Sequence, residues 1–408
     1  MIFKFFPIQY WNMASFEKFM NTGDIFKNIS VLSPHYVPKT LPFREKQMEE
    51  VMGVIAPALK GHKPRNMIIY GKTGTGKTCT MKRIMDEFEK VKTDANIHYL
   101  NCRIYNSRYR ILQKFMKFYY KELEKSGFGL PFLYEKIIET LGRNHQMIVV
   151  LDEIDMVKDL DELVYTLTRA NDEAEKGGIT IIGISNKLSF KERLDPRSRS
   201  SLHEVELIFP PYTSEQLQKI LEQRVDEGFQ KDVIKPSAIN LASAITAQES
   251  GDARYALKLL LHAGEIAEQH GKKNVDDSDV EEARKRVEMD LIAETVNTLP
   301  EMHKIVLHSI ASLSINGSRY ARLDEIENGF LMSGEVYDEY EKNCRELNKK
   351  SRSLRWYKEY LNDLEMLGLV TTTPSSKGIR GHTTLVKLGH TPEDVFEITK
   401  KNLFEQNT

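Results

Sequence analysis

The chain contains little cysteine and almost no net charge. Only Cys79, Cys102 and Cys344 occur in 408 residues, and no two of them form a CxxC pair. This spacing argues against a disulfide framework or a zinc site and fits the reducing cytosol. Since 58 Lys and Arg stand against 59 Asp and Glu, no global basic field points to nucleic acid. Any DNA-binding surface must therefore be local.

Long apolar runs are also missing. No stretch approaches the roughly 18 apolar residues that a membrane-spanning helix needs, so we expect no membrane partner. The first residues, "MIFKFFPIQYW", are apolar but interrupted by Lys4 and Pro7, and no small-residue cleavage site follows. A signal peptide is one interpretation of this start. An incorrectly assigned start, with Met13 as the true first residue, is the other.

Strands and helices are expected to alternate over the first two-thirds of the chain. We expect short apolar strands at 66–70, 97–100, 147–152, 179–185 and 204–209, with helices at 78–90, 108–125 and 132–144. This alternation predicts an α/β fold with a parallel sheet and helical crossovers. The strand at 147–152 is apolar throughout, as is typical of a strand covered on both faces.

The strand pattern stops at Pro210. Helices are expected at 214–229, 236–248, 253–270 and 276–289, with Ser214 and Asp276 as N-caps, and they predict an all-helical domain. After a joint near 291–300 the chain is helical to about Gly368 and then reads "LVTTTPSSKGIRGHTTLVKL", a hairpin pattern. Helices followed by a hairpin predict a winged helix. The expected domains are an N-terminal extension (1–14), an α/β nucleotide-binding domain (15–209), a helical lid (210–292) and a winged helix (293–408).

Residues 71–78, "GKTGTGKT", form a phosphate-binding loop. They match G-x-x-x-x-G-K-[ST] between an expected strand and an expected helix, which is the context that this motif requires. Glycine at 74 and 76 lets the backbone close around phosphates. Lys77 is expected to reach the β- and γ-phosphates of ATP, and Thr78 to bind Mg²⁺. The expected contacts with ATP or ADP in this loop are Gly71, Thr73, Gly74, Thr75, Gly76, Lys77, Thr78 and Cys79.

"IVVLDEID" supplies two acidic residues at the end of the third strand. Asp152 is placed to hold Mg²⁺ together with Thr78. Glu153 is placed to polarise a water molecule for attack on the γ-phosphate. Asp155, two residues further, is interpreted as a surface or capping acid.

Six motifs in this order resemble those of the AAA+ ATPases. They are "GKTGTGKT", "VVLDEID", "GISN", "LDPRSRSSL", "PPYTSEQLQKILEQR" and "GDARYALKLL". More narrowly, the chain resembles the archaeal origin-recognition and replication-licensing initiators over nearly its whole length. The resemblance implies an AAA+ ATPase domain, a helical lid and a C-terminal winged helix.

The resemblance also implies roles for residues outside the phosphate loop. Asn186 would sense the γ-phosphate or the attacking water, and Arg254 would reach the γ-phosphate from the lid. Arg197, with Arg199 as a competitor, would be an arginine finger offered to a neighbouring subunit. The stretch "YVPKTLPFRE" would wrap the adenine, with Val37, Pro38 and Arg44 as contacts. Tyr212 would pack beside the base and Arg224 would bind phosphate.

Two regions are candidates for DNA binding. Between Arg345 and Lys387 there are nine Lys and Arg against four Asp and Glu. Arg352, Arg355 and Lys358 are expected at the start of a recognition helix whose Leu354, Leu361, Leu364 and Leu367 face the core. The hairpin tip contributes Lys377, Gly378, Arg380, Gly381 and His382. The second region is the insertion after the second strand, where Arg103, Arg108 and Arg110 are candidates by the resemblance. A solvated basic surface is the alternative for the first region, and in the second the interleaved aromatic residues are more often packing residues than base wedges.

These features predict an ATP-dependent replication initiator. It would bind double-stranded origin DNA, help to recruit a replicative helicase, and use ATP binding and slow hydrolysis as a switch. Paralogous initiator subunits are possible partners, and the expected location is the cytoplasm, in association with the nucleoid. An ATP-gated transcription regulator, or a clamp-loader or branch-migration ATPase, would share the same motifs.

Overall fold

The computed structural model describes residues 25–34, 36–124, 127–174, 176–317, 329–374 and 384–404. The expected N-terminal extension (1–14) and the hairpin-tip candidates Lys377, Gly378, Arg380, Gly381 and His382 lie outside these residues. The chain divides into two compact units between Ala283 and Arg284, and each unit is described by itself. Among the described residues, no helix is both long enough and apolar enough to span a membrane.

The first unit is built on a five-stranded parallel sheet. Its strands are β1 (Met67–Tyr70), β2 (Asn96–Asn101), β3 (Gln146–Asp152), β4 (Gly178–Ser185) and β5 (Val205–Ile208), in the spatial order β2-β3-β4-β1-β5. Every residue of β3 and β4 is buried, as the continuous apolar sequence predicted. The parallel sheet expected from the sequence is therefore confirmed, and the carboxyl ends of β1, β3 and β4 meet at one edge.

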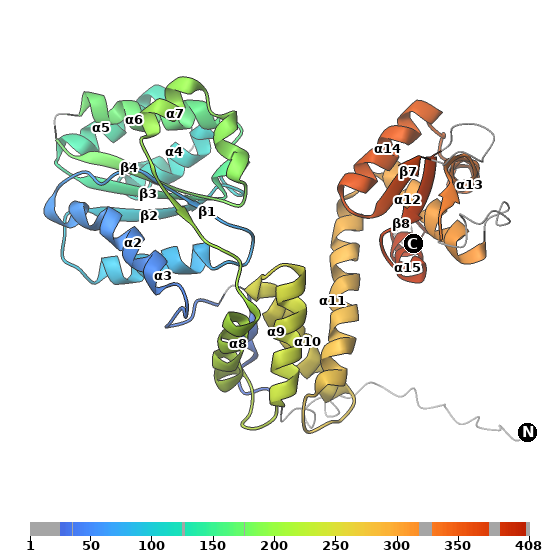
Figure 1. Cartoon of the computed structure of the whole chain (residues 1–408). Coiled ribbons are helices and arrows are strands. Elements are labelled where there is room, and N and C mark those ends of the chain that lie inside the picture. The colour runs from blue at the N-terminus through green and yellow to red at the C-terminus, as the bar shows by residue number, and fades with distance from the viewer. Residues whose placement is uncertain are drawn as a thin grey trace, which may run out of the picture. The chain divides into compact units, whose positions relative to one another are not determined.

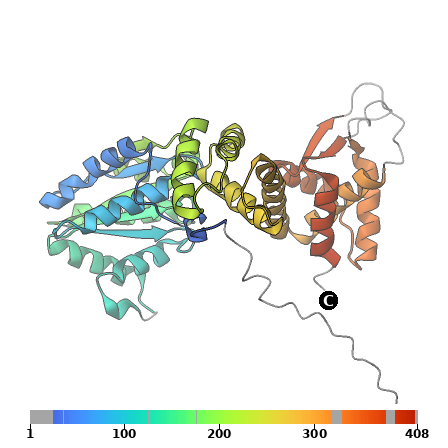
Figure 2. The same cartoon turned by 90° about the horizontal axis from the view of Figure 1, so that it is seen from below.

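Helices cover both faces of this sheet (Figures 1 and 2). One face carries α4 (Arg108–Met116), α5 (Leu130–Gly142), α6 (Leu160–Glu173) and α7 (Pro196–Leu202). The other carries α2 (Glu45–Ile55) and α3 (Lys77–Glu89). Short 3₁₀ turns complete this part of the chain: η1 (Ile29–Leu32), η2 (Ala56–Lys60), η3 (Lys121–Glu124), η4 (Ile154–Met156) and η5 (Leu188–Arg193). Each face of the sheet therefore has its own apolar core.

A helical lid follows the sheet. It consists of α8 (Ser214–Gly228), α9 (Pro236–Glu249), α10 (Ala253–Gln269) and the start of α11 (Asp277–Thr298). The turn η1, which precedes the sheet in sequence, packs against α8 and α10. The chain thus passes between sheet and lid twice within the first unit, before α2 and after β5.

The second unit is a winged helix. After the end of α11 it contains α12 (Glu301–Asn316), β6 (Leu331–Met332), α13 (Ser333–Glu346), α14 (Leu354–Met366), β7 (Val370–Pro374), β8 (Thr384–Leu388) and α15 (Pro392–Phe404). β7 and β8 form the expected antiparallel hairpin, and β6 pairs with β8. The apolar core lies between these strands and the helices.

Some sequence expectations are wrong at the ends of helices. Thr213, not Ser214, caps α8 in a capping box with Gln216. Leu361 and Leu364 are buried as expected, but Leu354 and Leu367 are 54% and 51% exposed. Both stand at the ends of α14, beyond the reach of the core, and the buried side chain of Tyr357 contributes to the core instead. The C-terminal helix α15 was not expected at all.

Candidate functional site

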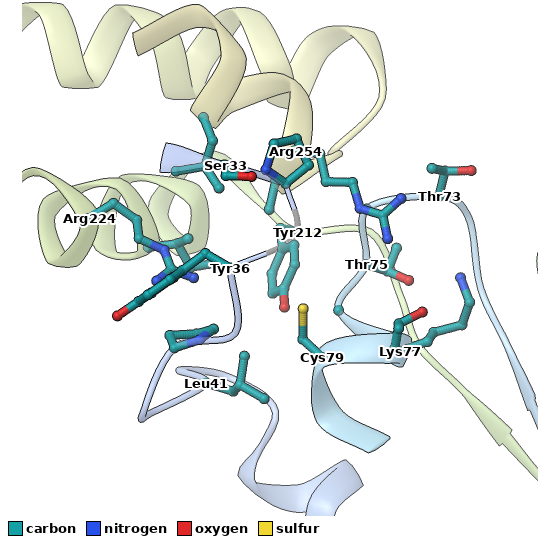
Figure 3. Close-up of a pocket in the computed structure, with 18 of the residues that line it drawn as sticks. Ser33, Tyr36, Leu41, Thr73, Thr75, Lys77, Cys79, Tyr212, Arg224 and Arg254 are labelled. Atoms are coloured by element: carbon teal, nitrogen blue, oxygen red, sulfur yellow. The ribbon is translucent and has the colours of Figure 1, made fainter. Parts of the chain in front are cut away.

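A cavity of about 360 Å³ opens at the carboxyl ends of β1 and β3, under the lid. Its walls come from the segment before α2, the phosphate loop, the end of β3, and the lid helices α8 and α10. Ligands of parallel α/β sheets bind at this edge, because the loops after the strands converge there. Figure 3 shows the lining side chains.

The phosphate loop forms one side of the cavity. Gly74 and Gly76 have φ values of 70° and 91°, which side chains other than glycine rarely adopt. Lys77 Nζ donates to the carbonyl oxygens of Gly71 (2.7 Å) and Lys72 (2.8 Å) and to Asn186 Oδ1 (2.9 Å). Burial, helped by the nearby Arg254, lowers the pKa of Lys77 to about 8, although Asp152 opposes this shift. An anion in the cavity would favour the charged form of this lysine.

Asp152 joins the phosphate loop to the sheet. Its Oδ2 accepts hydrogen bonds of 2.7 Å from the hydroxyls of Thr78 and Tyr99. The predicted pair of magnesium ligands, Thr78 and Asp152, is therefore in direct contact. A hydroxyl and a carboxylate side by side are oxygen ligands of the kind that Mg²⁺ takes in phosphate sites. These residues fit the expected ion.

Glu153, the residue after Asp152, has a left-handed backbone conformation (φ 55°). Its side chain lines the cavity. Its carboxylate forms an ion pair of 2.8 Å with Arg103 Nε. Arg103, for which DNA binding stays a prediction, lines the nucleotide cavity next to Glu153. Its pairing with the predicted catalytic acid has no local sequence signal, because the two residues lie fifty positions apart.

The lid contributes Arg254, the second residue of α10. Asp252 caps this helix by accepting a hydrogen bond of 2.7 Å from the backbone N–H of Arg254. The neighbouring N–H of Ala253 donates to the carbonyl of Gly74 at 3.2 Å. The lid therefore touches the phosphate loop directly, and the guanidinium of Arg254 points toward Thr73 and Lys77 (Figure 3).

Arg224 lies at the other end of the cavity, beside Tyr36 (Figure 3). Only 6% of it is exposed, and its Nε and Nη1 have no hydrogen-bond partner among the described residues. The Tyr36 ring lies 4.8 Å from the guanidinium carbon, and Tyr36 donates to Glu227 at 2.9 Å. Burial lowers the pKa of Arg224. Two buried donor atoms without a partner among the described residues are therefore available to a ligand in the cavity.

The remaining predicted nucleotide contacts divide into two groups. Pro38, Thr73, Thr75, Cys79 and Tyr212 line the cavity. Val37 lines a separate pocket with Lys82 and Tyr99, and Gly71 and Arg44 are also absent from the described lining of the nucleotide cavity. Arg44 is only 1% exposed. Arg197 lines a different basic pocket with Lys63, Arg65 and Arg169, so the chain does not bring it to its own nucleotide cavity.

The candidate DNA residues differ in their surroundings. Arg108 is paired with Glu162 at 2.7 Å, whereas Arg110 is exposed. In the winged helix, Arg352, Arg355 and Lys358 are all exposed around the start of α14. Two large apolar side chains lie among them, Leu354 (54% exposed) and Trp356 (53% exposed). The start of α14 thus carries both positive charge and an apolar surface.

Three family models match consecutive parts of the chain. An AAA domain matches residues 60–194, a Cdc6 AAA+ ATPase-type lid domain matches 218–285, and a CDC6 C-terminal winged helix domain matches 294–398. An ORC1-type DNA replication protein of Thermococcus kodakarensis is 39% identical over 391 residues, covering 92% of this chain and 91% of the relative. The chain belongs to the ORC1-type DNA replication proteins. The sequence-based identification of the family and of its three-part fold is confirmed.

Another relative and two solved structures are also similar to this chain over most of its length. ORC1-type DNA replication protein 1 of Archaeoglobus fulgidus is 39% identical, with 92% of this chain and 91% of the relative covered. The ORC1 protein of Aeropyrum pernix, solved in complex with DNA, aligns with a TM-score of 0.77 and 36% identity over 94% of this chain and 99% of that one. Cdc6p of Pyrobaculum aerophilum aligns with a TM-score of 0.56 and 25% identity, over 93% and 100% of the two chains.

Sequence reasoning missed two tyrosines in the nucleotide site of this ORC1-type chain. Tyr99 bonds to Asp152 from β2, where nothing in the local sequence marks it. Tyr36 packs on Arg224 and directly precedes the predicted Val37, so the motif "YVPKT" contained the signal. The roles of the predicted site residues stay predictions.

Proposed function

We propose that this chain is an ATP-dependent initiator that binds double-stranded origin DNA and helps to recruit a replicative helicase. One observation carries the proposal. A magnesium-type pair, Thr78 and Asp152, and a lid arginine, Arg254, converge on one phosphate loop, in a chain whose winged helix also exposes basic side chains around the start of α14. The ORC1 protein of A. pernix, which was solved with DNA, supports the DNA-binding part.

Each residue of the cavity has a defined task in this proposal. The loop amides and Lys77 bind the phosphates, while Thr78 and Asp152 hold Mg²⁺, which supplies charge neutralisation when it is bound. Tyr99 orients the Asp152 carboxylate through its 2.7 Å hydrogen bond. Arg224 donates to a phosphate of the nucleotide, as the resemblance implies, and Arg254 donates to the terminal phosphate that distinguishes ATP from ADP. ATP therefore binds sheet and lid together.

Slow hydrolysis follows from the position of Glu153. A base has to accept a proton from the attacking water molecule, but Arg103 Nε occupies Oε2 of the Glu153 carboxylate at 2.8 Å. With this oxygen engaged, only the other one is available to orient the water molecule. This arrangement suits a switch that keeps ATP bound, and it is unfavourable for a motor that turns over rapidly.

The winged helix supplies the DNA surface. Arg352, Arg355 and Lys358 bind backbone phosphates or guanine edges at the start of α14. Leu354 and Trp356, which the core leaves exposed, contact thymine methyl groups in the major groove. Recruitment of the helicase, action with paralogous subunits through Arg197, and association with the nucleoid complete the proposal.

Crosslinking the protein to its genome and sequencing the bound fragments tests the proposed function. Enrichment of repeats at replication origins is expected. Enrichment of promoters alone would favour an ATP-gated transcription regulator. Rapid, DNA-stimulated hydrolysis by a closed ring would favour a clamp loader or branch-migration motor.

A further inference from the structure

Arg44 is one of the most completely buried charged side chains among the described residues, with 1% exposure. It directly precedes α2 and makes no contact as a helix cap. A buried cation has to be compensated by hydrogen bonds or by aromatic rings. Its partners therefore indicate what the residue does.

The Arg44 guanidinium donates hydrogen bonds to three backbone carbonyls. Nε donates to Thr75 O in the phosphate loop at 2.9 Å, and Nη2 donates to Pro210 O at 2.7 Å. Nη1 donates to Phe43 O at 3.1 Å. Pro210 lies between β5 and α8, in the segment through which the sheet continues into the lid. One rigid, planar group thus connects the phosphate loop to the hinge of the lid.

Aromatic rings complete this connection on the hinge side. The guanidinium carbon of Arg44 lies 3.9 Å from the centre of the Tyr212 ring and 5.5 Å from that of Phe209. The Tyr212 hydroxyl lies 2.7 Å from where a Cβ on Gly76 would stand, and its backbone N–H donates to Gly251 O at 3.2 Å. Residues on both sides of Pro210 are therefore fixed against the phosphate loop and against the turn before α10.

We propose that Arg44 is a positioning residue that makes the phosphate loop and the lid hinge move as one unit. This inference rests on the proposed nucleotide function but assigns Arg44 a role other than contact with adenine. If the lid rotates about 209–213, either the bond to Pro210 breaks or Thr75 is displaced. Through this link, occupancy of the phosphate loop is transmitted to the lid, and the lid angle in turn determines the binding of ATP.

Hydrogen–deuterium exchange on the full chain tests the link, with and without the slowly hydrolysed analogue ATPγS. In the natural protein, ATPγS is expected to slow exchange in peptides covering the phosphate loop (71–78) and the hinge (209–213). Arg44→Lys keeps the charge but loses the planar fork. It is expected to keep protection of the loop and to lose most protection of the hinge. Arg44→Met is expected to show the same loss.

Nucleotide affinity provides a second measurement on the same variants. Affinity for ATPγS is expected to fall about tenfold in Arg44→Lys, and that for ADP less than threefold, because only the triphosphate uses Arg254 on the lid. Exchange in the β3 peptide (146–152) reports whether the fold is intact, and it is expected to remain unchanged in Arg44→Lys.

Two outcomes would overturn the inference. One is unchanged hinge protection and ATPγS affinity in Arg44→Lys. The other is a parallel loss of ATPγS and ADP affinity with faster exchange in β3, since Arg44 would then only support the fold. If the natural protein itself gains no protection from ATPγS, the proposed nucleotide function fails instead, and the two failures are distinguishable.

Discussion

Replacing Gly74 with alanine tests whether the lid rests on the phosphate loop. Gly74 has a φ of 70°, and an added Cβ would stand 1.5 Å from Oδ1 of Asp252. To relieve this overlap the Asp252 side chain and the phosphate loop have to move apart, which breaks the hydrogen bond from the N–H of Arg254 to Asp252 and separates Ala253 N from Gly74 O. The substitution therefore disturbs both the conformation of the loop and its contact with α10.

The expected loss of stability in Gly74→Ala is about 3 kcal/mol. Left-handed backbone contributes about 1 kcal/mol, the lost helix cap about 1 kcal/mol and the lost backbone hydrogen bond about 1 kcal/mol. Gly61 provides a matched control, because its φ is 76° but no atom of the described residues lies within 4 Å of an added Cβ. Gly61→Ala should show only the conformational cost, about 1 kcal/mol.

Calorimetry of the nucleotide-free protein measures the difference. At about 2–4 °C per kcal/mol, Gly74→Ala should lower the melting temperature by about 6–12 °C and Gly61→Ala by about 2–4 °C. Asp252→Ala alone should cost about 1 kcal/mol through loss of the cap. Because it removes the colliding carboxylate, the double variant with Gly74→Ala should lose about 2 kcal/mol instead of the additive 4.

Two results would refute this reasoning. Equal melting temperatures for Gly74→Ala and Gly61→Ala would mean that the phosphate loop has free space in solution. An additive double variant would mean that Gly74 and Asp252 are not in contact. Either result would remove the direct route by which the phosphate loop influences the lid.

Other predictions concern nucleotide and DNA. Lys77→Ala and Glu153→Gln should each reduce ATP hydrolysis at least 100-fold while changing duplex affinity less than threefold; loss of duplex binding in both would contradict the switch model. Because burial lowers the pKa of Lys77 to about 8, ATP affinity should fall as pH rises above 8, and ATP binding at pH 8 should take up about half a proton. Titration calorimetry in buffers of different ionisation enthalpy measures this uptake. An ATP affinity that is independent of pH from 7 to 9 would exclude a contribution of Lys77 protonation to ATP binding. Arg355→Ala should reduce the slope of log K against log salt for duplex DNA by about 1, whereas Lys342→Ala, a cation paired with Glu339, should not. Genomic fragments amplified with deoxyuridine in place of thymidine should bind the natural protein several-fold more weakly, and Trp356→Ala should reduce this difference, with Leu354 accounting for the rest; equal sensitivity of both proteins would exclude methyl contacts by Trp356.

The sequence determined the phosphate loop and the family of this protein. The phosphate loop "GKTGTGKT" is one continuous stretch, and Asp152 is the last residue of an apolar strand. Both features are therefore encoded by consecutive residues and can be recognised from the sequence. The same holds for the alternation that predicted the parallel sheet, since each strand carries its own apolar signal. Six such local motifs in register were enough for the family, and the comparisons confirmed it.

The tertiary structure alone decided which distant side chains meet. Arg103 pairs with Glu153, Tyr99 with Asp152, and Arg44 with the carbonyls of Thr75 and Pro210. These partners are 31 to 166 positions apart. From the sequence alone, a basic residue is interpreted as a surface residue and an aromatic residue as a core residue. Only the folded sheet shows that they contact each other. The exposure of Leu354 and Leu367 was equally hidden, because helical spacing defines a face but not where the core beneath that face ends.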